Sequence, residues 1–195
     1  MDKGIFSERE QAAEAAYFRQ HDARLVERLR QGAKLEEVAS ALAEKLHVDN
    51  PDLLQKARLV GVTAETAPAL FLAPLVQVAW VDGSVSSAEQ ATVLRIAAER
   101  GVEAGSPAHD QLVQWLRVRP SDALFDTAVE VIKYGLDVLP PDERDERITR
   151  IVHSCHEVAE TSGGGLLKAL GLGSGVSGLE ASMLDTITST LRSGS

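Results

Sequence analysis

Two carboxylates flank a glycine turn near the middle of the chain, at Asp82 and Glu89. With Gly83 between them, they match the fifth, sixth and twelfth positions of a calcium-binding loop. The first and third positions of such a loop would be Val78 and Trp80, whose side chains offer no oxygen ligand. A high-affinity calcium site of that kind is therefore not expected. Two interpretations stay open: a weaker divalent-cation site that adds carboxylates from elsewhere, or a simple turn followed by a helix cap.

A second group of polar side chains lies at residues 153–157, where two histidines, a serine, a cysteine and a glutamate follow one another. On a helix His153 lies one turn from both His156 and Glu157, and this spacing can hold a metal ion. Cys155 falls on the apolar stripe of the same helix, which predicts burial in the core. Because Cys155 is the only cysteine, intrachain disulfides and cysteine-rich zinc sites are excluded. We favour a structural role for this group.

The elements that position these residues are predicted to be helices, because apolar residues recur at helical spacing between helix start and stop signals. We expect seven to nine helices and no β-strand: residues 7–31, 35–46, 51–60, a helix that runs from a cap at Thr63 or Thr66 to Val81, and then 87–100, 107–116, 122–138, 142–160 and 178–191. Gly32 is expected to end the first helix, and Pro74 to bend the fourth. Residues 162–178, rich in Gly and Ser, are expected to form a flexible loop.

The composition favours an all-α protein with a buried core. The 195 residues are 44% hydrophobic but only 4% aromatic, which suits helices better than a sandwich or barrel. No apolar run approaches the roughly 20 residues that a membrane span needs. Residues 1–4 lack the apolar core of a signal peptide, so we expect a cytoplasmic protein.

The negative charge is concentrated in the C-terminal two thirds of the chain. Residues 1–62 carry 10 Lys and Arg and 11 Asp and Glu, a net charge of −1, whereas residues 63–195 carry 10 and 18, a net charge of −8. A nucleic-acid binder needs Lys and Arg to displace counterions, so binding to nucleic acid is not expected. The acidic part suits a basic protein partner or a cation.

The glycine turn and the helix cap that follows it recur near the C-terminus. Residues 85–89 and residues 176–180 share the pattern Val-Ser-x-x-Glu. Asp82-Gly83 precedes the first copy, and Ser162-Gly163 precedes the second, from which an insert at residues 164–175 separates it. Ser162 stands in the second copy where Asp82 stands in the first, so chemistry that needs this carboxylate would survive only once. We interpret the pattern as an internal duplication. The alternative is that both copies are ordinary capping boxes.

Residues from about 68 to 192 resemble the TerB-like tellurite-resistance family. The resemblance rests on the Asp82-Gly83 turn, on the motif at residues 85–89 and on its second copy at residues 176–180. It implies an all-helical, internally duplicated bundle with an acidic surface sometimes proposed to hold a divalent cation. It also implies links to stress response or to membrane-associated complexes, and it names no reaction.

Residues 4–19 are similar to the inhibitory segment of the mitochondrial-type ATPase inhibitor family. The matching residues are Phe6, Arg9, Glu10, Gln11, Ala12, Glu14, Tyr17, Phe18 and Arg19. The resemblance implies a helix that inserts into a rotary ATPase, with Tyr17 and Phe18 as apolar anchors and with Arg9 and Glu10 pairing with the partner. The histidine-rich continuation of that family is missing, since only His21 lies nearby. The alternative is an exposed helix rich in Ala, Glu and Arg.

Together these observations predict three regions: an exposed helical arm at residues 1–32, linking helices packed on the bundle at 33–62, and a TerB-like acidic helical bundle at 63–195. The function we favour is non-enzymatic: binding of a protein partner through the acidic surface and the arm, with Phe6, Arg9, Glu10, Glu14, Tyr17 and Phe18 as partner-binding residues. One alternative is a regulator of F1-ATPase that acts through residues 4–30. The other is a divalent-metal binder or metal-dependent hydrolase centred on Asp82 and Glu89, with a divalent cation as its cofactor.

Overall fold

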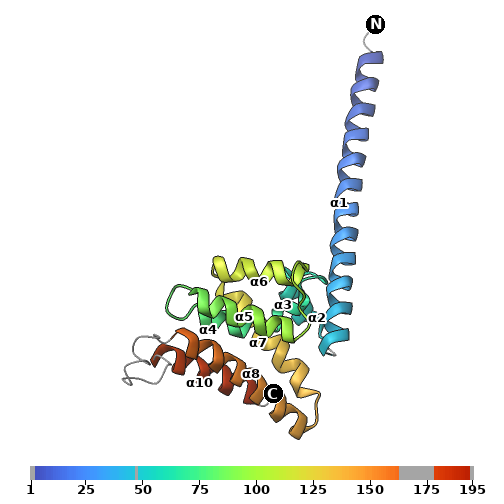
Figure 1. The fold of residues 1–195 in the computed structure, drawn as a ribbon. Coiled ribbons are helices and arrows are strands. Elements are labelled where there is room, and N and C mark those ends of the chain that lie inside the picture. The colour runs from blue at the N-terminus through green and yellow to red at the C-terminus, as the bar shows by residue number, and fades with distance from the viewer. Residues whose placement is uncertain (1–2, 47, 163–177, 194–195) are drawn as a thin grey trace, which may run out of the picture. The chain divides into compact units, whose positions relative to one another are not determined.

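The structure, a computed structural model, describes residues 3–46, 48–162 and 178–193, with side chains from residue 20 onward except at 35, 42, 45, 46 and 162. In these ranges the chain forms nine α-helices and no β-strand (Figure 1). The helices are α1 (Lys3–Leu46), α2 (Pro51–Leu59), α3 (Ala67–Leu70), α4 (Ala73–Ala79), α5 (Ser87–Glu99), α6 (Pro107–Arg117), α7 (Asp122–Asp137), α8 (Pro141–Ser162) and α10 (Gly178–Arg192). The all-α prediction is confirmed. None of these described helices has both the length and the apolar content to cross a membrane.

The chain divides into an N-terminal unit, Met1–Glu37, and a main unit, Val38–Ser195. The N-terminal unit contains only the first part of α1, and each of its described side chains is exposed. Helix α1 continues through Gly32, so the predicted stop at that residue is wrong. A glycine inside a helix costs only about 1 kcal/mol relative to alanine, which the good helix formers around Gly32 can offset.

The core of the main unit surrounds α4. This helix packs against α5, α6, α7, α8 and α10, and six of its seven residues are buried. Helices α8 and α10 lie side by side (orange and red in Figure 1), and α8 also packs against α5. The largest fully buried side chains include Phe125, Leu70, Leu72 and Leu75. Helix α4, which is short and apolar, therefore lies at the centre of the core and contacts five other helices.

The predicted bent helix that runs to Val81 from a cap at Thr63 or Thr66 is instead two short helices, α3 and α4. Phe71 and Leu72 separate them, and Pro74 lies in the first turn of α4. Proline lacks an N–H group and its ring clashes with the carbonyl four residues earlier, but the first turn of a helix tolerates it. The chain therefore starts a new helix at Ala73, with Pro74 in its first turn, rather than bending one long helix.

Three helices begin at a side chain that caps them, Asn50 at α2, Ser86 at α5 and Ser106 at α6, whereas Thr66 and Ser121 precede α3 and α7 without a side-chain cap bond. The side chain of Asn50 accepts hydrogen bonds from two backbone N–H groups at the start of α2, and Ser106 accepts one at the start of α6. At the other end of α2, Gly61 adopts a φ of 88°, and the N–H of Val62 donates to the carbonyl of Ala57. This is the bond of a helix that ends at a left-handed glycine. Residues 163–177 of the predicted Gly- and Ser-rich loop, including the predicted cap Ser177, lie outside the described residues, whereas Ser162 ends α8 and Gly178 begins α10.

Candidate functional site

The site that the sequence singles out is the corner between α4 and α5, formed by residues 80–89. Gly83 makes the turn with a φ of 83°, and its N–H donates to the carbonyl of Trp80 at 2.9 Å. A side chain at this φ would be strained, so the corner needs glycine there. The predicted capping box is confirmed: the N–H of Glu89 donates to Ser86 Oγ at 3.2 Å, and the N–H of Ser86 donates to Glu89 Oε2 at 2.7 Å.

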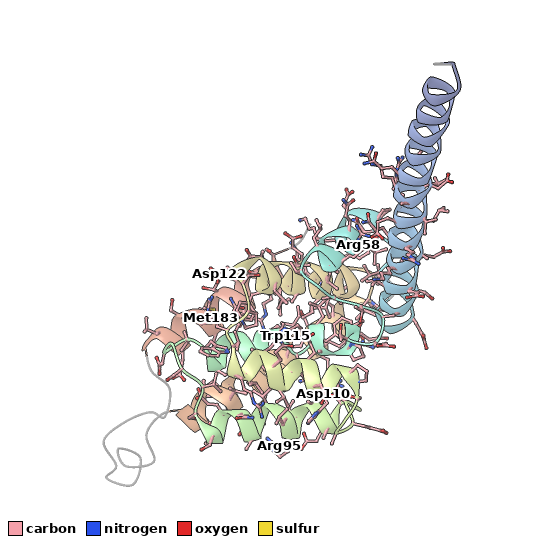
Figure 2. All side chains as sticks on the ribbon, turned by 90° about the horizontal axis from the view of Figure 1, so that it is seen from above. Arg58, Arg95, Asp110, Trp115, Asp122 and Met183 are labelled. Atoms are coloured by element: carbon pink, nitrogen blue, oxygen red, sulfur yellow. The ribbon has the colours of Figure 1, made fainter. Side chains whose placement is uncertain are left out.

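Trp80, at the start of the corner, forms a hydrogen bond with helix α6. Its indole Nε1 donates to the backbone carbonyl of Trp115, in α6, at 2.8 Å. Trp115 is itself buried, and Figure 2 labels it together with Arg95 on α5. The carbonyl of a residue in the last turn of a helix lacks an intrahelical partner, so the indole satisfies a group that would otherwise need water. The corner is therefore held at both ends.

Glu89 is a buried carboxylate, with only 4% of its surface exposed. Burial raises the pKa of Glu89, and the two hydrogen bonds with Ser86 oppose that rise. The carboxylates of Glu180 and Asp82 raise the pKa further by repulsion. Glu180, in the first turn of α10, is fully buried. The fold therefore places Glu180 close enough to Glu89 for its carboxylate to raise the pKa of Glu89. These are the glutamates of the two Val-Ser-x-x-Glu motifs.

Asp82 and Glu89 differ in what their carboxylates can do. Asp82 is exposed on the turn, whereas Glu89 is buried and bonded to Ser86. Within the described residues, no three His, Cys, Asp or Glu side chains are grouped so that they could hold a metal ion. Glu89 acts as a cap in this structure, and Asp82 presents a carboxylate to solvent.

The group at residues 153–157 separates into different surroundings. Cys155 is fully buried, as predicted. His156 lies 3.5 Å from Glu160, and Glu157 pairs with Arg95 of α5 rather than with His153. The predicted one-turn spacing therefore does not bring His153 and Glu157 together as a pair.

Cys155 is expected to be unreactive in the folded protein. Burial raises the pKa of its thiol to about 12, although nearby Arg100 acts in the opposite direction. The nucleophile in thiol chemistry is the thiolate, which is scarce at neutral pH when the pKa is this high. A thiol-reactive dye should label the native chain far more slowly than the chain in denaturant. Equal labelling rates in the two states would contradict this prediction, and the readout is unambiguous because the chain has one cysteine.

The predicted partner-binding residues Phe6, Arg9, Glu10, Glu14, Tyr17 and Phe18 fall in α1, but their side chains lie outside the described residues. Further along the same helix, Leu25, Val26 and Leu29 are exposed by 46%, 46% and 66%. These three residues are not among the predicted partner-binding residues. Their signal in the sequence is their place within residues 20–31, where Ala23 is the only other apolar residue.

Glu180 was also not predicted as a site residue, although the duplicated motif contained it. Repeat spacing shows that two segments are alike, but only the folded chain shows that their glutamates approach one another. No protein-family model, curated protein or solved structure matches this chain.

Proposed function

We propose that this protein acts without catalysis, as a TerB-like helical interaction domain of the stress-response type. It binds a protein partner through α1 and through the acidic surface of the main unit. The observation that carries this proposal is the exposure of Leu25, Val26 and Leu29 in a unit that consists of one helix.

A helix gains most of its stability in a protein by packing an apolar face against other elements. The N-terminal unit offers α1 no such element, and all its described side chains are exposed. Leu25 and Leu29 are four residues apart, so they lie on one face, and Val26 borders it. Helices of this kind are bound in grooves of partner proteins through a few apolar anchors. A partner that covers this face supplies the missing packing.

The acidic surface supplies the second contact. The net charge of residues 63–195 is −8, which attracts a partner with a basic surface and speeds encounter with it. Exposed carboxylates in this part of the chain include Asp82 on the corner between α4 and α5. Binding through this surface is expected to weaken as salt rises, whereas binding through the apolar face of α1 is not.

The proposal includes an internal duplication of the main unit, with α5 and α10 as corresponding helices. Glu89 lies in the first turn of α5 and Glu180 in the first turn of α10, and both are buried. Their mutual repulsion, which contributes to the raised pKa of Glu89, supports related positions for the two copies.

The test compares two double variants in affinity capture from a lysate of the source organism. Leu25→Gln with Leu29→Gln removes the apolar face of α1. Glu27→Gln with Gln31→Glu is the matched control, because it keeps the net charge and alters the opposite face of the same helix. The wild type and the control should enrich the same partner, and the Leu variant should lose it by tenfold or more, since buried apolar anchors are each worth about 2 kcal/mol or more.

Enrichment of the same proteins by all three chains would overturn the role of α1.

The identity of the partner separates the proposed interaction domain from an inhibitor of a rotary ATPase. If the partner is an F-type ATPase, the full chain should inhibit ATP hydrolysis by F1-ATPase and the chain lacking residues 1–32 should not. That result would place the function in the segment that resembles the ATPase inhibitors.

A further inference from the structure

A cavity of about 260 Å³ opens in the main unit between α7, α8 and the residues Phe71 and Arg100, which directly follow α3 and α5. Its apolar wall includes Phe71, Ile132, Leu136 and Ile151. Its remaining lining contains three arginines and no carboxylate. This combination is unusual in a protein of net charge −9. Ligand pockets typically combine an apolar wall with a few polar groups that fix one end of the ligand.

Arg100 lines the cavity and is hydrogen-bonded to a buried side chain. Its Nη2 donates to Ser154 Oγ at 2.6 Å, and Ser154 is buried in α8. Among the described residues Arg100 forms no ion pair with a carboxylate. Removal of water from around the guanidinium lowers the pKa of Arg100, and the charge of Arg150 also lowers it, whereas Cys155 and Glu99 act in the opposite direction. Burial is the largest of these effects, so the guanidinium lies partly out of water at the cavity.

The other two arginines, Arg147 and Arg150, come from α8. Arg150 pairs with Glu146 at 2.7 Å, so part of its charge is already neutralised. Arg147 is exposed and, like Arg100, has no ion-pair partner among the described side chains. Two guanidinium groups, Arg100 and Arg147, are therefore available for an anion at this cavity. A guanidinium presents several N–H donors in a plane, which suits the two oxygens of a carboxylate.

A second cavity of about 200 Å³ adjoins the first, since Phe71 and Arg100 line both. Leu72 and Val102 contribute to its wall. An apolar chain whose charged end is held at Arg100 therefore has apolar surface on either side of Phe71. The volume of the first cavity is slightly below the range usual for ligand pockets, about 300–1,000 Å³, so the ligand must be small.

We propose that this cavity binds a free aliphatic carboxylate of short to medium chain length. Arg100 and Arg147 hold the carboxylate, and the chain packs against Phe71, Ile132, Leu136 and Ile151. The binding is separate from the partner contacts of α1, because every residue of the cavity belongs to the main unit. The cavity's arginines select for an anion, and its apolar wall selects against small hydrophilic anions.

The test is calorimetric titration of the full chain with octanoate. We expect saturable binding with one octanoate per chain, and no binding of octanol or octylammonium, which have the same tail without an anionic head. Arg100→Gln and Arg147→Gln should each weaken octanoate binding by about tenfold or more, because hydrogen bonds to charged groups are worth at least that factor. Arg117→Gln is the matched control, since Arg117 is an exposed arginine of α6 outside the cavity, and should bind like the wild type.

Circular dichroism establishes that each variant is folded, and Arg147→Gln keeps the test decisive if Arg100→Gln does not fold. Octanol that binds as tightly as octanoate would overturn the assignment of the arginines. Unchanged octanoate binding in both Arg100→Gln and Arg147→Gln would do the same, as would the absence of saturable heat for the wild type. Binding of octyl phosphate without binding of octanoate would overturn the choice of a carboxylate.

Discussion

A Leu75→Ala variant is expected to lose about 3–5 kcal/mol of the free energy of unfolding. Leu75 is fully buried in α4, and α4 packs against five other helices. Removing its side chain leaves a cavity that these helices cannot fill, because each is held by its other contacts. Much of the marginal stability of the main unit would be lost, since natural domains have only about 5–15 kcal/mol in total. Urea unfolding followed by circular dichroism measures the change.

Leu59→Ala is the matched control for this variant. Leu59 ends α2 and is 70% exposed, so its truncation removes little buried surface and should change stability by less than about 0.5 kcal/mol. Similar losses in the two variants would contradict the placement of α4 at the centre of the core. The comparison isolates burial, because the chemical change is the same at both positions.

The local elements could be predicted from the sequence because their signals are local. Asn50, Ser86 and Ser106 each precede a helix and bond to its free N–H groups, as their sequence context indicates. The burial of Cys155 likewise follows from its place on an apolar stripe. Signals of this kind involve residues within one or two helical turns, so a sequence contains all of their information.

The errors arose where a local signal competed with its surroundings. Gly32 is a common helix stop, but in α1 it stays helical between good helix formers. Pro74 indicated a bend, whereas the chain breaks before it and starts α4. Glycine and proline do disfavour the interior of a helix. Whether the helix continues, bends or ends at such a residue depends on a small difference in free energy between the alternative backbone conformations.

The candidate sites were less predictable, because they join residues that are distant in sequence. Arg100 and Arg147 meet at one cavity only because the end of α5 and the middle of α8 lie together. Glu89 and Glu180 were recognised as equivalent by pattern, yet their approach depends on the packing of the main unit. Patterns identify candidate residues, and long-range packing decides which of them share a site.

Glu89→Gln is expected to gain stability relative to the wild type as pH rises from about 4.5 toward neutrality. Burial, with repulsion from Glu180 and Asp82, raises the pKa of Glu89 above its ordinary value of 4.5. The folded chain therefore keeps this proton at pH values where the unfolded chain has released it. The corresponding stability is fully present below the unfolded pKa and is lost as pH rises through the folded pKa. Glutamine cannot ionise, so the variant avoids that loss, and its side-chain oxygen can still accept from the N–H of Ser86.

Glu89→Ala separates the cap from the charge. It removes the acceptor for the N–H of Ser86 and should cost about 1–2 kcal/mol, the usual effect of losing a helix cap. Urea unfolding between pH 4 and about pH 7.5 measures both variants, with Glu65→Gln, an exposed glutamate before α3, as the control. A stability difference between Glu89→Gln and the wild type that stays constant over this range would show that Glu89 holds no extra proton in the fold. A difference that grows with pH would show that the ionised carboxylate of Glu89 destabilises the fold, as expected where Glu89 and Glu180 are buried near one another.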